Sequence, residues 1–569
     1  KSCEKVRLRI IDGCASTSFW MTFGGDDPLL VSADGLDVVP VKKNKTFIGI
    51  AETYDFIITV PKEGKIEFKI TAQDGSGTAS AFIGNGNVWP AMNIPRPDKI
   101  GMMQKMAKMD MKMGAHALKF QPKKDERFKM KGEYGMKMDK MSGMDMSKPK
   151  DSMGMGEMKK MKMDHSKMEE IDMKKDNIMS GMKMEKPKDS IQMDHSTMTR
   201  RQMNNNDAMK GMQMNKQKDT MKTGKMEGMD LFSEYNYDYL KSLKKTNYDK
   251  NIPVKEVLLN LTGNMNRYIW SMNGVPLSEA DKIKINSKEV TRITFNNLTM
   301  MHHPMHLHGH FFRVINKNGD YSPLKHTVNV PPMQKITIEF YGNNGDESGD
   351  WFFHCHILYH LMGGMARVVS YDTPRDPRMD EFPVSKIIKE TDKWYSWGMV
   401  DALSQNTTMN LVTSNIRNQF NASVEYGYNK NLEAEFTYER YLHDYLRVFG
   451  GVNIENETRK SLDQFKTTAV VGVRYLTPYL FALDARIDSE LRPRISLGRS
   501  IMVFPKLSVF GYYEYQLDLG IVNNLPIGKD FTSETVWSAG AEYFLSRNFS
   551  LMASYDNRFG SGGGLSVRF

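Results

Sequence analysis

Cysteine is almost absent from this sequence, since only three of its 569 residues are Cys. So low a content excludes a disulfide-rich scaffold. Cys3 and Cys14 flank a predicted strand, Lys5–Ile11. An extended chain covers about 3.3 Å per residue, which separates the two thiols by much more than the roughly 7 Å that a disulfide allows. We therefore expect no disulfide in this chain.

Long apolar runs are also absent. No stretch approaches the roughly 18 consecutive apolar residues that a transmembrane helix requires. The sequence has neither an initiating Met nor a signal peptide, because Lys1 leads directly into a strand. The chemistry described below is typical of exported proteins, so we expect the N-terminus to be cut and the signal peptide to lie outside this chain.

Aromatic residues are few where positive charge is dense. The formal net charge is +10, but the Lys residues concentrate in one Met-rich segment with few aromatic residues between them. A nucleic-acid-binding surface usually combines the two, so we expect no nucleic acid partner.

The length predicts three or four folded units. Changes in composition divide the sequence into segments 1–98, 99–249, 250–373, 374–404 and 405–569. The first segment contains no His and alternates short apolar strands with turn signals such as Ala33-Asp34-Gly35, which predicts an all-β sandwich. The strands expected there are Lys5–Ile11, Leu29–Val31, Phe47–Ile50, Thr53–Val60 and Lys65–Ala72.

Segment 99–249 is of low complexity. About two-thirds of the 46 Met residues lie between Met102 and Met229, interleaved with Lys, Asp and Gly. Such a segment cannot bury enough apolar surface to offset its chain entropy, so we expect it to be disordered. Soft thioethers beside imidazole favour Cu(I), and the alternative is a solvated linker that binds nothing. The repeated ligands are Met161, Met163, His165, Met168, Met193, His195 and Met198.

Two His clusters lie in segment 250–373. The first includes His303, His306 and His308, and the second combines Cys355 with flanking His residues and a later Met. Two His, a Cys and a weak axial Met form the ligand set of a blue-copper electron-transfer site. The alternative is a group of surface or core His satisfied by hydrogen bonds. The strands expected in this segment are Val254–Asn260, Ile283–Ile285, Glu289–Asn296, Phe311–Asn316, Lys335–Phe340 and Met365–Ser370.

Strand geometry explains the order of these ligands. Side chains alternate faces along a strand, so His354 and His356 point one way and Cys355 the other. His306 and His308 likewise share a face, while His303 lies an odd number of residues away and can turn toward Cys355. The pattern predicts two metal centres on opposite faces, joined through Cys355.

The motifs His303-Pro-Met-His306-Leu-His308-Gly and His354-Cys355-His356-x-x-x-His360-x-x-x-x-Met365 resemble the C-terminal copper motifs of multicopper oxidases. The flanks Leu261–Trp270 and Lys325–Pro332 resemble the CopA-type copper-resistance oxidases. The resemblance implies type 1 copper on His303, Cys355, His360 and Met365. It also implies type 2 copper on His306 and type 3 copper on His308, His354 and His356, with Cys355, His354 and His356 carrying the electrons. Segments 1–98 and 250–373 would be the second and third cupredoxin-like Greek-key sandwiches of such an oxidase.

Segment 405–569 alternates apolar and polar residues. Phe436 and Tyr438 alternate with Glu435 and Thr437, and the chain ends on Phe569. This period, with aromatic residues near the strand ends, predicts an antiparallel transmembrane β-barrel of about ten strands between Gln419 and Phe569. A soluble β-sandwich is the alternative. Thr477–Phe481 and Ser508–Tyr512 resemble the CopB-type outer-membrane copper-resistance proteins. Segment 374–404 would be a linker.

Together these features predict an all-β oxidase, exported to the periplasm and anchored in the outer membrane of a Gram-negative cell. It would oxidise Cu(I) to Cu(II) and reduce oxygen to water. A copper-sequestering outer-membrane protein without turnover and a laccase-like phenol oxidase are the alternatives. The family's trinuclear centre takes eight His, and only His306, His308, His354 and His356 are available here. The remaining candidates are isolated in the sequence, so we expect this chain alone not to reduce oxygen; they are His116, His165, His195, His326 and His443.

Overall fold

In a computed structural model, the structure describes residues 2–98, 100–101, 104, 111–112, 115–120, 135–136, 233–342, 349–457 and 461–569. Most of segment 99–249, including its Met and His ligands from Met161 to Met198, lies outside these residues. The prediction of disorder therefore stays a prediction. Within the described residues, no helix is both long enough and apolar enough to cross a membrane.

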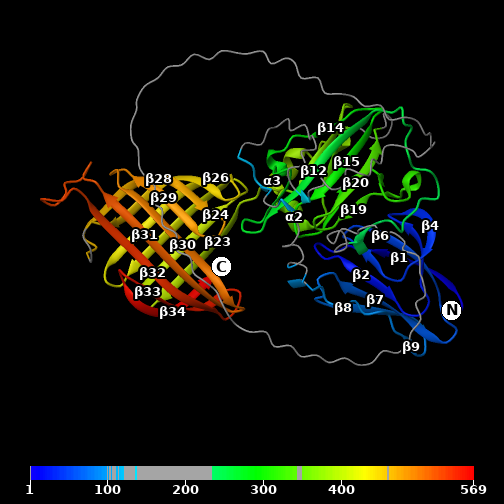
Figure 1. The fold of residues 1–569 in the computed structure, drawn as a ribbon, viewed down its shortest axis with the longest axis horizontal. Coiled ribbons are helices and arrows are strands. Elements are labelled where there is room, and N and C mark those ends of the chain that lie inside the picture. The colour runs from blue at the N-terminus through cyan, green and yellow to red at the C-terminus, as the bar shows by residue number, and fades with distance from the viewer. Residues whose placement is uncertain are drawn as a thin grey trace, which may run out of the picture. The chain divides into compact units, whose positions relative to one another are not determined.

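The first sandwich consists of two sheets at the N-terminal end of the chain, antiparallel except where β9 pairs parallel with β7 (Figure 1). One sheet has the order β1-β6-β3-β4, and the other has β5-β2-β7-β8 with β9 added beside β7. The strands are β1 (Lys5–Ile11), β2 (Phe19–Phe23), β3 (Leu29–Ala33), β4 (Leu36–Lys42), β5 (Thr46–Ile48), β6 (Thr53–Thr59), β7 (Gly64–Ala72), β8 (Thr78–Asn85) and β9 (Val88–Trp89). Cys3 and Cys14 are exposed free thiols.

Strand β6 shows how this sequence makes a sandwich. Tyr54, Phe56 and Ile58 are buried, whereas the residues between them are partly exposed. This alternation presents one apolar face to the facing sheet, where Phe23 packs against Phe56.

The second sandwich carries both His clusters. Its sheets have the orders β13-β12-β15-β20-β17-β18 and β14-β22-β21-β16-β19. The strands are β12 (Val254–Asn264), β13 (Ile269–Met272), β14 (Ile283–Ile285), β15 (Val290–Asn297), β16 (His303–Leu307), β17 (Phe312–Val314), β18 (Leu324–Lys325), β19 (Thr327–Val330), β20 (Lys335–Tyr341), β21 (Asp350–Cys355) and β22 (Ala366–Tyr371). Short elements connect them, namely η1 (Ser233–Tyr235), η2 (Leu277–Glu279), η3 (Gly319–Tyr321) and α2 (Leu358–Met362); two further strand pieces, β10 (Met111–Lys112) and β11 (Gly135–Met136), pair with each other.

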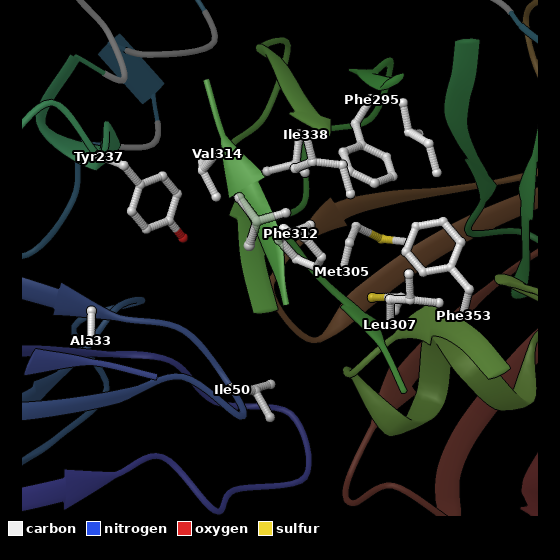
Figure 2. Close-up of a cluster of buried hydrophobic side chains, with 14 of the residues drawn as sticks. Ala33, Ile50, Tyr237, Phe295, Met305, Leu307, Phe312, Val314, Ile338 and Phe353 are labelled. Atoms are coloured by element: carbon white, nitrogen blue, oxygen red, sulfur yellow. The ribbon is translucent and has the colours of Figure 1, made fainter. Parts of the chain in front are cut away.

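The core of the second sandwich lies between its two sheets. Met305, Leu307 and Phe353 point into it and meet Phe295 and Ile338 from the other sheet (Figure 2). Met305 and Leu307 are neighbours in β16, two residues apart, so the side chains between and beyond them must point to the opposite face. The residues packed in the core therefore determine which His side chains point to the opposite face of the sheet.

The C-terminal part forms a closed antiparallel barrel in which β23 pairs with β34 (Figure 1). Its strands are β23 (Tyr395–Leu403), β24 (Asn406–Ser414), β25 (Asn418–Gly427), β26 (Asn431–His443), β27 (Leu446–Asn456), β28 (Phe465–Leu476), β29 (Ala482–Asp488), β30 (Pro493–Phe504), β31 (Leu507–Asp518), β32 (Thr532–Phe544), β33 (Phe549–Asp556) and β34 (Gly560–Arg568). It follows η4 (Pro377–Met379) and α3 (Val384–Glu390).

The prediction of an all-β chain is confirmed, and that of about ten barrel strands is wrong because the barrel has 12. The two additional strands, β23 and β24, precede Gln419. Trp397, Gly398, Met399 and Val400 interrupt the alternation in β23, and β24 is mostly polar, so neither gives a clear period of two. Because these strands close into a barrel, the alternative of a β-sandwich is wrong for this part of the chain.

The two faces of the barrel wall differ in polarity. In β26, Phe436 and Tyr438 are exposed outside, whereas Thr437 and Glu439 are fully buried inside. Ion pairs cross the interior, such as Arg494 with Glu433 at 3.3 Å and Arg558 with Glu425 at 2.7 Å. The barrel therefore combines an apolar exterior with a polar, ion-paired interior.

Candidate metal centres

The register of two neighbouring strands brings the His clusters together. Strand β16 pairs antiparallel with β21, so that Met305 lies opposite Cys355 and His306 lies opposite His354. Residues directly opposite share a face. The parity expected from the sequence is therefore present, with Cys355 on the core face and His354 on the other.

Three candidate ligands meet on the core face. The Cys355 Sγ lies 3.7 Å from His303 Nδ1 and 3.6 Å from His360 Nδ1, and the two Nδ1 atoms are 3.1 Å apart. His303, Cys355 and His360 are all buried, and within the described residues they are the one His, Cys or carboxylate group compact enough to hold a metal ion. We call these three residues the Cys355 centre.

A helical turn explains how His360 reaches this centre. Strand β21 ends at Cys355, and helix α2 follows, carrying His360 back over the strand end. The Cys355 amide donates to Met365 O at 3.1 Å, and the Met365 amide donates to His360 O at 3.0 Å. The buried Met365 is therefore tied through its backbone to two members of the Cys355 centre.

Hydrogen bonding leaves the inner nitrogen of His303 free. The Thr299 hydroxyl donates to Asn297 Oδ1 at 2.9 Å, because that oxygen can only accept. The same hydroxyl lies 2.7 Å from His303 Nε2, so it accepts the proton there. His303 Nδ1 then carries a lone pair directed at Cys355. Burial also drives the pKa of His303 well below its ordinary value and that of His360 to about 3, which keeps both rings neutral.

The thiol of Cys355 stays protonated unless a cation binds beside it. Burial raises the pKa of Cys355 far above its ordinary range, so the thiolate is unstable without a positive partner. Two neutral imidazoles beside a buried thiol form a soft donor set that suits copper. Trp270 closes one side, with its ring stacked on His360 at a centroid distance of 3.7 Å.

The opposite face of the same strands carries an imidazole wall, which we define as His306, His308, His354 and His356. Neighbouring ring centroids lie 4.9 to 5.8 Å apart. His308 Nε2 and His354 Nε2 are 3.1 Å apart, so at most one proton fits between them. His354 Nδ1 donates to Cys355 O at 2.9 Å, which leaves its Nε2 free to bind a metal.

The structure adds a fifth imidazole beside this wall. His326, isolated in the sequence, lies with its ring centroid 5.3 Å from that of His306. Its backbone carbonyl accepts a hydrogen bond from His306 Nδ1 at 2.8 Å. No sequence spacing signals this position, because it depends on the pairing of β16 with β19.

The chain resembles known proteins over both sandwiches. Residues 252–375 and residues 1–89 both match the family described as multicopper oxidase. The chain is 32% identical over 376 residues to Copper resistance protein A of Escherichia coli, a match that covers 64% of this chain and 55% of that protein. It is 37% identical over 119 residues to Multicopper oxidase MmcO of Mycobacterium tuberculosis, covering 21% of this chain and 23% of the relative.

Solved structures give a weaker likeness. Fet3p, a multicopper oxidase that functions in iron import, matches 65% of this chain and 56% of its own with 13% identity and a TM-score of 0.36. That score is too low to support a conclusion.

The chain spans about half the length of the Escherichia coli protein and about a fifth of the Pseudomonas syringae copper resistance protein A.

Proposed function

We propose that this chain, which matches the multicopper oxidase family over residues 1–89 and 252–375, serves copper resistance by oxidising Cu(I) to Cu(II). The observation that carries the proposal is the Cys355 centre, in which the thiol Sγ and the Nδ1 atoms of two neutral imidazoles lie within 3.7 Å of one another. We assign His303, Cys355, His360 and Met365 to type 1 copper. We assign His306 to type 2 copper and His308, His354 and His356 to type 3 copper.

Copper bound at these residues would supply one-electron oxidation of the substrate at one face and reduction of oxygen at the other. The chain's own part is to hold, orient and connect the ligands. Cys355 lies between His354 and His356 in sequence, and the hydrogen bond from His354 Nδ1 to Cys355 O gives a second route between the faces. The thiol is fully buried and therefore shielded from water, and Trp270 covers the neighbouring His360 ring.

The imidazole wall needs partners to bind three metal ions. The resemblance implies eight His for such a centre, and the wall supplies four. We therefore propose that oxygen reduction requires imidazoles beyond those of this sequence. The Met-rich segment, with Met161, Met163, His165, Met168, Met193, His195 and Met198, would collect Cu(I) through its thioethers.

The barrel supports a membrane location. Its exterior carries exposed apolar side chains such as Val471, Val473, Ile495 and Leu497, while ion-paired charges such as Glu435, Arg474 and Arg486 lie inside. We propose that it anchors the oxidase in the outer membrane, with the copper centres in the periplasm. An even number of strands returns both barrel ends to one side, which places the preceding segments with the short turns. Protease added to intact cells should then spare residues 1–373, and their rapid digestion would reverse the orientation.

Anaerobic mixing tests the substrate. The copper-loaded chain should lose its thiolate absorption band when Cu(I) is added, with one electron entering per type 1 site, and it should respond far more slowly to a phenol. Loss of the band with the phenol alone would identify a laccase-like enzyme. No loss with either reductant would favour copper sequestration. Because oxygen is excluded, the result does not depend on completing the imidazole wall.

A further inference from the structure

The first sandwich has no His, yet one of its carboxylates lies directly behind the imidazole wall. We propose that Asp34 is a positioning residue that holds His306 ready to bind copper, acting across the two sandwiches through residues 325–327. This inference rests on the proposed function, since it concerns copper at the imidazole wall. Sequence analysis identified Asp34 only as part of a turn.

Asp34 is fixed from both sides. It lies in the turn between β3 and β4 with a positive φ of 49°, and its side chain is buried. Its Oδ1 accepts from Thr53 N at 2.9 Å, within the first sandwich. Its Oδ2 accepts from His326 N at 3.1 Å and from Thr327 N at 3.2 Å, both in the second sandwich. A single carboxylate therefore anchors the start of β19 to the other sandwich.

Buried charge strengthens this anchor. Lys325 Nζ lies 3.1 Å from Asp34 Oδ2 and 3.3 Å from Glu52 Oε1, and all three side chains are at most 1% exposed. The ammonium also lies 4.9 Å from the ring centroid of Tyr54. A Lys ammonium that contacts a carboxylate makes one of the strong hydrogen bonds.

The anchored peptide then orients His306. His306 Nδ1 lies 2.8 Å from His326 O and 3.0 Å from Thr327 Oγ1. A carbonyl oxygen has no proton to give, so His306 Nδ1 must donate and its Nε2 carries the lone pair. The same bond fixes the ring plane. In the antiparallel register His306 is paired with Thr327, so a shift of the 326–327 peptide would rotate the ring directly.

The alternative is that Asp34 only joins the sandwiches. The two roles differ in where the damage appears. If Asp34 acts through His306, its loss changes Cu(II) binding at the imidazole wall and leaves the Cys355 centre unchanged. A general loosening of the sandwiches lowers stability without a selective effect on the wall.

The experiment titrates Cu(II) alone into the purified full chain and follows affinity, the electron paramagnetic resonance of wall-bound Cu(II) and the thiolate band. Thr327→Val removes one contact to His306 at nearly constant volume, and Asp34→Asn weakens the anchor. Each should lower the wall's Cu(II) affinity about 10- to 100-fold and alter its hyperfine splitting, with the thiolate band retained. Thr327→Ser, which keeps the hydroxyl, should retain the Cu(II) affinity and hyperfine splitting of the wild-type chain.

Matched controls separate the outcomes. Asp55→Asn loses an exposed ion pair with Arg7 in the same sandwich and should leave both signals unchanged. In a His306→Ala background, Asp34→Asn should cause no further loss, because its effect passes through that ring. Unchanged wall affinity and hyperfine splitting in both Thr327→Val and Asp34→Asn would overturn the inference, even if the unfolding midpoint fell. Failure of the proposed function would instead appear in the wild-type chain, as a missing thiolate band.

Discussion

His306 of β16 lies directly opposite His354 of β21, and one residue earlier Met305 lies opposite Cys355. This single register places four imidazoles on one face of the sheet and the thiol on the other. A slip of one residue between the strands would bring the thiol to the wrong face, because side chains alternate with a period of two. The pairing of these two strands therefore determines both candidate centres.

Lys325 offers a test of the contact between the sandwiches. Lys325→Met would leave Asp34 and Glu52 buried without their cation, and breaking such a pair costs about 3–5 kcal/mol. Urea unfolding followed by tryptophan fluorescence should show a loss of this size.

The matched control for that variant is Lys282→Met. Lys282 pairs with Asp350 at 2.8 Å, but its side chain is 48% exposed. Solvent screens an exposed pair, so the expected change is about 0–1 kcal/mol. Equal losses in the two variants would contradict a special role for the buried group.

The acid limit of copper binding follows from burial. Burial lowers the pKa of His306 to about 4 and that of His354 to about 3. Protons compete with Cu(II) only when the pH approaches these values, whereas ordinary imidazoles are already half protonated at about pH 6.5. Cu(II) affinity at the imidazole wall should therefore stay nearly constant from pH 7 to about pH 5 and fall steeply below about pH 4.5.

Equilibrium dialysis across this pH range measures the effect, with the His306→Ala variant used to subtract binding at other sites. A fall in Cu(II) affinity centred at about pH 6.5 would mean that the imidazole wall is as solvated as a surface His cluster.

The barrel exterior gives a third prediction. Val471 in β28 is 57% exposed and faces outward. A Lys near the bilayer midplane costs about 2–4 kcal/mol, so Val471→Lys should destabilise the barrel folded in lipid vesicles by up to this amount. Tyr479→Lys, in the turn after β28 and 77% exposed, is the control and should cost about 0–1 kcal/mol. A smaller effect for Val471→Lys than for the control would argue against membrane insertion through this face.

Oxygen consumption gives a fourth prediction. The imidazole wall supplies four of the eight His that the family resemblance implies. We therefore expect an oxygen electrode to record no catalytic uptake when Cu(I) is added to the purified polypeptide of this sequence. Sustained uptake that disappears in a His354→Ala variant would mean that further ligands from this chain complete the centre.

Local pattern made much of this fold and site predictable. The period of two along Trp351–Cys355 and around His306 is a property of one strand, so the sequence alone yields the parity of the ligands. The motif spacing from Cys355 to His360 is also local, because one short helical turn spans it.

Nonlocal pairing could not be predicted in this way. Asp34 and Thr327 are 293 positions apart, and neither belongs to a spaced motif. His326 reaches the imidazole wall only because β19 pairs with β16. In the barrel, β23 belongs to the closed sheet because it pairs with β34, although its own sequence alternates poorly. Tertiary context decided all three.

The visible spectrum of the purified chain on titration with Cu(II) tests most directly whether the Cys355 centre holds copper. If His303, Cys355 and His360 hold type 1 copper, an intense Cu–thiolate band should rise to one equivalent, with the narrow hyperfine splitting of a blue site. Cys355→Ser should abolish the band while Cys14→Ser leaves it unchanged, since Cys14 is exposed. A colourless wild-type protein that binds Cu(II) with an ordinary spectrum would contradict the account.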